Sequence, residues 1–147
     1  MSKPDYVYST YIKSTPQKVW EAVTGAEFTR QYFGVPLISD WKPGSPWRME
    51  NPNNPVLGKV LESNPPRKLV FSWMEGNNPD LGTSKVTYEI EQIGDTVCLT
   101  VLHDELSAGM AAKISTGWPR VLSSLKSLLE TGAALDMGAM KKGSCAA

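Results

Sequence analysis

The feature that most constrains the fold is a pair of alternating stretches, SKVTYEIEQI and TVCLTVLHD, which Gly94 and Asp95 join. In the first stretch Val86, Tyr88 and Ile90 alternate with polar or charged residues. A period of two places one set of side chains on the buried face of a β-strand and the other set on its wet face. Glycine and aspartate between two such stretches are typical of a tight turn. The two stretches therefore predict an antiparallel hairpin that packs one face on the core.

Several other stretches of strand length precede this hairpin. Clusters of proline, glycine and asparagine separate them, and such clusters interrupt regular structure. Together with the hairpin, these stretches predict an antiparallel sheet of about six or seven strands. The predicted earlier strands are YVYSTYI (6–12), PWRME (46–50), VLGKVLE (56–62) and KLVFSW (68–73).

Two short helices are predicted after the first strand. Thr15 followed by Pro16 is typical of a helix start, because the hydroxyl can cap free N–H groups and proline has none to cap. The first of these helices covers PQKVWEAV (16–23), and a second covers residues 26–32.

A long amphipathic helix is predicted near the C-terminal end. Its apolar residues follow the i, i+4, i+7 rule, and Gly132 is placed to end it. Pro119 leaves two interpretations: a kink in a helix that begins near Ser107, which we favour, or the first turn of a helix that begins near Thr116. The predicted apolar stripe is Ile114, Trp118, Val121, Leu122, Leu125, Leu128 and Leu129, and the predicted outward residues are Arg120, Ser123, Ser124, Lys126 and Ser127.

This order of elements predicts an α+β fold in which a curved antiparallel sheet wraps around the long C-terminal helix. A helix of about 25 residues is about 37 Å long and can cross a whole sheet. Since one helix does not fill a wide concave face, an apolar cavity is expected at one end, and such cavities are the usual small-molecule sites. Residues 1–132 are predicted to form one domain. Residues 133–147 show little periodicity and are predicted to be a disordered tail.

Six segments, in this order, carry a family resemblance: PQKVWEAVT, PGSPWRME, GKVLESNPPRKLVFSW, KVTYEIE, LTVLHDEL and GWPRVLSSLKSLLETG. Over residues 6–132 the chain resembles the heat-shock-protein-90 ATPase activator-like family of the START-type helix-grip (SRPBCC) superfamily. The resemblance implies a helix-grip fold with a pocket between the sheet and the C-terminal helix. It implies no single chemistry, because members of the superfamily bind lipids, hormones or polyketides and some are enzymes. The 147 residues leave no room for the separate N-terminal module of the protein that named the family, so we do not expect ATPase activation to follow from the name.

The inward rows of the sheet and the helix predict which side chains a small hydrophobic ligand would contact. Apolar and aromatic residues would hold the body of the ligand, while Tyr88 and His103 would supply polarity. No cofactor is expected. The predicted ligand-contacting residues are Trp47, Met49, Phe71, Trp73, Val86, Tyr88, Leu99, Val101, His103, Trp118 and Leu122.

His103, the only histidine, is followed by Asp104 and Glu105. Neighbouring strand residues point to opposite faces and a catalytic zinc site typically uses three protein ligands, so we expect no metal here. The chain has no GxSxG elbow of a serine hydrolase, and no catalytic residue is assigned. Two interpretations stay open: a hydrogen-bonded histidine near a strand end, which we favour, or the polar group at the mouth of the pocket.

Composition excludes several partners. Lysine and arginine number 15 and so do aspartate and glutamate, which leaves no basic surface for nucleic acid. The N-terminus lacks the apolar core of a signal peptide, and no apolar run is long enough to span a membrane. Two cysteines do not make a disulfide framework. We expect a cytoplasmic protein, monomeric or homodimeric.

Three functions follow, in order of preference. The first is non-catalytic binding of a small hydrophobic ligand between the sheet and the C-terminal helix. The second is a protein-interaction module, such as a co-chaperone or stress-response partner, that uses the exterior of the sheet rather than the cavity. Trp41, which precedes a turn, is expected to be exposed enough to contact a partner. The third is an enzyme of the cyclase or dehydratase type.

Overall fold

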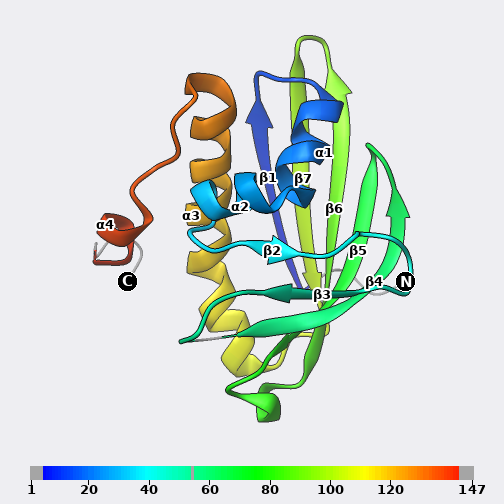
Figure 1. Cartoon of the computed structure of the whole chain (residues 1–147), viewed down its shortest axis with the longest axis vertical. Coiled ribbons are helices and arrows are strands. Elements are labelled where there is room, and N and C mark those ends of the chain that lie inside the picture. Colours follow the sequence, from blue (N-terminus) through cyan, green and yellow to red (C-terminus); the bar gives the residue numbers. More distant parts are fainter. Residues whose placement is uncertain (1–4, 54, 143–147) are drawn as a thin grey trace.

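The computed structural model describes residues 5–53 and 55–142, which form a curved sheet with helices on its concave side (Figure 1). The strands are β1 (Tyr6–Ile12), β2 (Leu37–Ile38), β3 (Pro46–Met49), β4 (Val56–Asn64), β5 (Lys68–Glu75), β6 (Thr83–Ile93) and β7 (Thr96–Asp104). The helices are α1 (Pro16–Thr24), α2 (Ala26–Tyr32), the 3-10 helix η1 (Pro79–Leu81), α3 (Ala108–Thr131) and α4 (Met137–Lys142).

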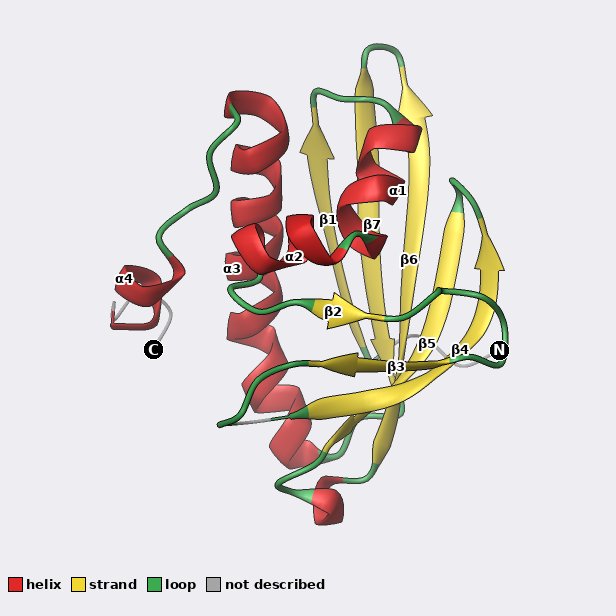
Figure 2. Ribbon diagram, viewed as in Figure 1, coloured by secondary structure: helices red, strands yellow, loops and turns green. Residues whose placement is uncertain are grey.

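The seven strands form one antiparallel sheet in the order β1-β7-β6-β5-β4-β3-β2, which confirms the predicted fold class. Strands β6 and β7 make the predicted hairpin, with Tyr88 opposite Val101. Gly94 adopts a φ of 63° in the turn, a conformation that glycine allows without steric cost. The register of β4 shifts between Val60 and Glu62, and such irregularities bend a strand. The bend fits the strong curvature of β4 in Figure 2.

Helix α3 begins and ends at the residues that its capping chemistry predicts. The Ser107 hydroxyl oxygen accepts a hydrogen bond from the backbone N–H of Met110, and Gly132 ends the helix with a left-handed φ of 86°. Pro119 therefore lies inside one helix of 24 residues, as in the favoured interpretation. From the middle of this helix, Trp118 packs against side chains of three strands, namely Trp73, Tyr88 and His103.

The two short helices also lie where the sequence predicts them. The Thr15 hydroxyl accepts a hydrogen bond from the backbone N–H of Lys18, and Pro16 is the first residue of α1. Helix α2 lies against α3, and Phe33, which follows α2, packs edge-on against Trp118 with ring centroids 6.4 Å apart. Phe33 thus adds a third wall to the space between the sheet and α3.

Trp41 corrects one expectation. Its side chain is buried, its indole N–H donates a 2.8 Å hydrogen bond to the carbonyl oxygen of Thr24, and its ring stacks on Trp47. The backbone takes a φ of 57° at Trp41. Burial of a large ring with its N–H satisfied outweighs the cost of that conformation. The turn was predicted, but the direction of the side chain was not.

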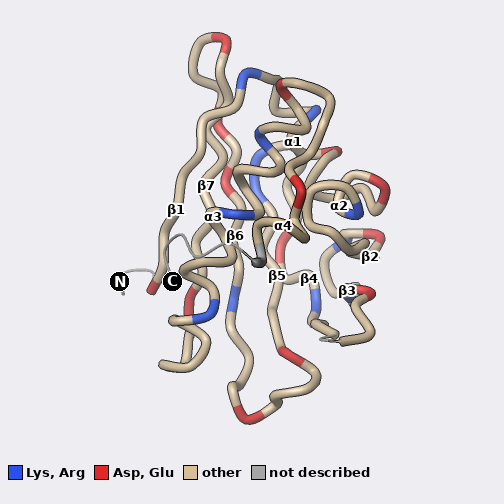
Figure 3. Tube along the Cα trace, turned by 90° about the vertical axis from the view of Figure 1, so that its left-hand side faces the viewer, with Lys and Arg blue, Asp and Glu red and all other residues tan. Residues whose placement is uncertain are grey.

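The segment after α3 returns along the helix. Leu135 donates its backbone N–H to the hydroxyl of Ser124, which is fully buried rather than outward-facing as predicted. The predicted tail contains α4, and Met137 packs against the core cluster. Residues 143–147 lie outside the described residues, and the domain boundary at 132 stays a prediction. Figure 3 views the molecule from the left-hand side of Figure 1 and shows acidic and basic residues interspersed along the chain.

Candidate functional site

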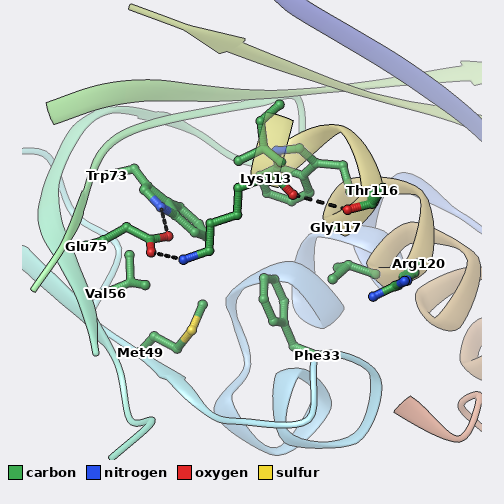
Figure 4. Close-up of a pocket in the computed structure, with 12 residues that line it drawn as sticks. Phe33, Met49, Val56, Trp73, Glu75, Lys113, Thr116, Gly117 and Arg120 are labelled. Atoms are coloured by element: carbon green, nitrogen blue, oxygen red, sulfur yellow. Dashed lines mark hydrogen bonds and ion pairs between the residues drawn. The ribbon is translucent and has the colours of Figure 1, made fainter. Parts of the chain in front are cut away.

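An apolar cavity of about 340 Å³ lies between α3, the ends of β3 and β5, and Phe33 (Figure 4). We call it the α3 cavity. Its lining residues come from segments far apart in the sequence: Phe33, Met49, Val56, Trp73, Glu75, Lys113, Ile114, Thr116, Gly117, Trp118, Arg120 and Val121.

Aromatic rings form much of its wall. Trp73 and Trp118 lie 5.9 Å apart between ring centroids, and Phe33 meets Trp118 edge-on. Met49 and Val56 come from the antiparallel pair β3 and β4, in which they are direct partners. Large rings and flexible methionine provide an apolar surface with few polar groups to satisfy, which suits an apolar ligand.

One polar group in the wall of the α3 cavity is a buried carboxylate. Glu75 is buried at the end of β5, where it pairs with the ammonium group of Lys113 from α3. It also accepts a 3.4 Å hydrogen bond from the indole N–H of Trp73. Figure 4 shows Lys113 reaching across the space to Glu75. A carboxylate removed from water needs such partners, so this pair anchors α3 to β5.

Gly117 is the unexpected member of the wall. It lies in the interior of α3, where glycine costs about 1 kcal/mol relative to alanine. A Cβ atom built on Gly117 would meet no heavy atom within 4 Å. Close packing therefore does not require glycine at this position. Gly117 lines the α3 cavity, so glycine here leaves the wall without a side chain at this point.

A smaller hollow of about 150 Å³ adjoins the cavity on the side of α4. We call it the outer hollow. Both are lined by Phe33, Met49, Gly117, Arg120 and Val121, and the outer hollow adds Val35, Asn51 and Met137. The two spaces therefore share these residues as a common wall.

Arg120 stands at this junction. Its residue is partly buried, whereas the sequence pattern predicted that it faces outward. Within residues 5–53 and 55–142, no carboxylate pairs with its guanidinium group. Figure 4 places Arg120 on the other side of the space from the Glu75–Lys113 pair.

His103 lies beneath the cavity wall rather than in it. Its Nδ1 atom accepts a 3.0 Å hydrogen bond from the indole N–H of Trp118, which requires the proton of a neutral ring to be on Nε2. Nε2 then donates to the hydroxyl of Ser84 at 2.7 Å, and that hydroxyl donates to the carbonyl oxygen of Trp73. Complete burial lowers the pKa of His103 to about 4, so the ring is neutral near pH 7.

This chain of hydrogen bonds has a structural consequence. It ties together Trp73 and Trp118, the two tryptophans that line the α3 cavity. His103 thus lies near the end of β7 with its hydrogen bonds satisfied, in agreement with the favoured interpretation. The arrangement fixes the ring of Trp118, whereas the ring of Trp73 is held by its hydrogen bond to Glu75.

The sequence-predicted ligand residues divide into two groups. Met49, Trp73 and Trp118 line the α3 cavity. The others pack in the core outside its wall, and their contact with a ligand stays a prediction. This second group is Trp47, Phe71, Val86, Tyr88, Leu99, Val101, His103 and Leu122.

Sequence reasoning missed part of the wall, although two signals were present. The inward row of β5 continues past Phe71 and Trp73 to Glu75, and a carboxylate on a buried face suggests a partner. A glycine in the interior of an amphipathic helix, as at Gly117, is the second signal. Phe33 and Val56 had no local signal, because their place depends on how the sheet curves.

Two other sites are disfavoured by the geometry. A hollow of about 360 Å³ beside α1 is lined partly by Asp40 and Lys42, which are exposed, so it lacks an enclosed apolar wall. Within the described residues, no cluster of three histidine, cysteine, aspartate or glutamate residues could hold a metal ion. In the same part of the chain, no helix has the length and apolar character needed to cross a membrane.

A curved antiparallel sheet, a long C-terminal helix across it and a cavity between the two define a helix-grip protein of the SRPBCC type. The sequence model of the Activator of Hsp90 ATPase homolog 1-like protein family matches residues 13–130. The chain belongs to this family, as the resemblance predicted.

Solved structures share the fold. CalU16 from Micromonospora echinospora superposes with a TM-score of 0.75 at 21% identity, over 92% of this chain and 80% of that one. An HSP90 activator from Plasmodium falciparum gives 0.68 at 22% identity, over 79% and 88% of the two chains. The Aha1 dimer from Colwellia psychrerythraea gives 0.72 at 22% identity, over 86% and 96%. At these identities the likeness concerns the fold alone. A search of curated proteins found no match.

Proposed function

We propose that this protein binds a small molecule with a largely apolar body in the α3 cavity. The observation that carries the proposal is Gly117, an unfavourable residue for a helix interior, which lines the cavity and has open space where a side chain would stand. A volume of about 340 Å³ lies within the usual range for small-molecule sites, roughly 300–1,000 Å³. Burying about 200 Å² of apolar ligand surface would contribute about 5 kcal/mol before the cost of ordering the ligand.

The test fills the cavity from within the helix. Gly117→Leu adds a side chain where no atom stands, so the fold should survive, whereas the space for a ligand should disappear. Binding of the neutral fluorescent probe N-phenylnaphthylamine is then measured for the wild type, Gly117→Leu and Gly117→Ala. We expect Gly117→Leu to lose at least about tenfold in affinity and Gly117→Ala to lose little, since each buried CH₂ group contributes about 0.8 kcal/mol.

Thermal unfolding of each variant is the control for folding. A folded Gly117→Leu protein that binds the probe as the wild type does would contradict the proposal. Native mass spectrometry of the protein purified under mild conditions would show in addition whether it retains a small molecule from the cell. A cytoplasmic location of the protein is part of the proposal.

Family membership favours a second candidate, a protein-interaction role of the co-chaperone kind. The HSP90 activator from Plasmodium falciparum has the same fold. The outer face of the sheet carries exposed apolar side chains, among them Val7 and Tyr11 on β1. Such a role predicts that the protein binds Hsp90 and changes its ATPase rate, and that Gly117→Leu leaves both effects intact. The protein-interaction role also includes the formation of a homodimer, since the similar structure from Colwellia psychrerythraea is a dimer.

An enzyme of the cyclase or dehydratase type has weaker support. Tyr88 and His103, the groups that the sequence suggested for acid–base chemistry, lie outside the wall of the α3 cavity. Burial also raises the pKa of Tyr88. Both groups are therefore neutral near pH 7, and neither lines that cavity.

A further inference from the structure

The charges around the α3 cavity do not balance. Its charged lining residues are Glu75, Lys113 and Arg120, and only Arg120 carries charge in the wall of the outer hollow. The carboxylate of Glu75 already pairs with Lys113. Both spaces are thus left with the positive charge of Arg120, which no carboxylate of the described residues neutralises.

A partly buried guanidinium group beside apolar walls favours an anionic partner. Partial burial removes some of the water that hydrates the guanidinium group. A bound anion replaces this lost hydration with charge-assisted hydrogen bonds. Its planar fork matches the two oxygens of a carboxylate, which lysine cannot do in the same way.

Arg120 is also at the right place along the helix. It follows Gly117 by three residues, and side chains at this spacing share one face of a helix about 5–6 Å apart. An anion on Arg120 would therefore leave the rest of a small molecule beside the open space at Gly117 and the ring of Trp118. The short distance between Arg120 and the open space at Gly117 suits one molecule with an apolar body and an acidic group at one end.

Resting on the function proposed above, we infer that the ligand is a monoanionic amphipathic molecule, an aryl or alkyl carboxylic acid, whose carboxylate binds Arg120. Its apolar body occupies the α3 cavity between Phe33, Trp73 and Trp118. The Glu75–Lys113 pair holds the wall together and takes no part in binding the anion.

Two matched probes test the charge. Anilinonaphthalene sulfonate and N-phenylnaphthylamine have the same ring system, and only the first carries an anionic group. For the wild type we expect the anionic probe to bind more tightly. Arg120→Gln should weaken the anionic probe about tenfold and the neutral probe less than about twofold, because only the anionic probe loses a charge-assisted hydrogen bond. Arg120→Lys should fall between, since it keeps the charge and loses the fork.

Lys59→Gln is the matched control. It removes one positive charge from an exposed position on β4, outside the cavity wall. Equal losses for Arg120→Gln and Lys59→Gln would overturn the inference, because they would show only a general electrostatic effect. A neutral probe that binds as well as the anionic probe would overturn it too.

The carboxylate itself is tested with naphthylacetic acid and its amide, and with decanoic acid and its amide, as competitors of the bound probe. We expect the acid of at least one pair to compete better than its amide in the wild type and to lose this advantage in Arg120→Gln. Equal competition by acid and amide would overturn the inference. Failure of the binding proposal looks different: the neutral probe then binds Gly117→Leu and the wild type alike.

Discussion

At the scale of single residues, burial divides the polar groups around the site into two kinds. His103, Ser84 and the indole N–H of Trp118 satisfy one another in the core, where each unpaired group would cost about 1–3 kcal/mol. Arg120 lies in the cavity wall with no carboxylate to pair with among the described residues. The first kind stabilises the fold, and the second kind keeps a charge that the carboxylates of the described residues leave unpaired.

The buried histidine predicts a loss of stability in acid. The pKa of His103 is about 4 in the folded protein, mainly because of burial, against 6.5 in an unfolded chain. Between these values the unfolded chain binds a proton that the folded protein does not bind. The contribution is therefore complete above about pH 6.5 and is lost as the pH falls towards 4, by about 3 kcal/mol in all. Asp5 and Glu75 favour the cation and act against burial, less strongly.

Urea unfolding of the wild type and of His103→Gln between pH 4 and pH 7 measures this contribution. The variant should be less stable at pH 7 by about 2 kcal/mol, because Trp118 and Ser84 lose partners of the right geometry. Its free energy of unfolding should change less with pH than that of the wild type. Carboxylates titrate in both proteins, so the difference between the two curves isolates the histidine. Parallel curves would contradict the prediction.

Gly117 predicts a gain of stability from a single methyl group. Alanine in a helix interior is more favourable than glycine by about 1 kcal/mol, and the Cβ atom of Gly117→Ala meets nothing. We expect the melting temperature to rise by about 3 °C. Differential scanning calorimetry would show this. A fall instead would mean that the space at Gly117 closes around a side chain, which would also weaken the argument for an open cavity.

At the scale of the elements, α3 does two things at once. Its buried side chains fill the core, and its middle turn, with Gly117 and Arg120, leaves space and charge on the same face. The neighbouring elements adapt to it: Phe33 after α2 closes one side, and the pair of Glu75 and Lys113 closes another.

The same substitution at the end of α3 should have the opposite sign. Gly132 takes a left-handed φ of 86°, and a residue with a Cβ atom resists this conformation by about 1–2 kcal/mol. No neighbour would obstruct the added atom, so only the backbone conformation opposes Gly132→Ala. We expect the free energy of unfolding to fall by about 1 kcal/mol, measured beside Gly117→Ala under the same conditions. Changes of equal sign in the two variants would contradict this reading of the helix.

At the scale of the whole molecule, the sequence predicted the fold well because the fold depends on periodicity. The β6–β7 hairpin, α1, α2 and α3 each carry a local signal, by alternation, by capping or by an apolar stripe. Strand β2 has only two residues, Leu37 and Ile38, and gives no such signal. Trp41 shows the same limit, since its burial depends on how a loop folds back on α1.

The site was harder to predict, because a cavity is space that side chains leave unfilled. The inward rows predicted Trp73 and Met49 in its wall, and the helical stripe predicted Trp118. The same rows also gave Phe71, Leu99 and Val101, which fill the core where the sheet is more fully covered. Periodicity tells which face a residue occupies, but the position of the gap along that face follows from the curvature of the sheet and from Phe33 and Gly117.

Ligand binding in the cavity predicts one property of the whole molecule, a stability that depends on ligand concentration. A ligand that binds only the folded state, present at about 100 times its dissociation constant, adds about 2.7 kcal/mol to the free energy of unfolding. For a domain of this size that corresponds to a rise in melting temperature on the order of 8 °C. Calorimetry with increasing anilinonaphthalene sulfonate should show this rise for the wild type, a smaller one for Arg120→Gln and almost none for Gly117→Leu. Because any binding of the probe to the unfolded chain acts equally on all three proteins, the differences among them report the cavity, and equal rises in all three would place the probe elsewhere.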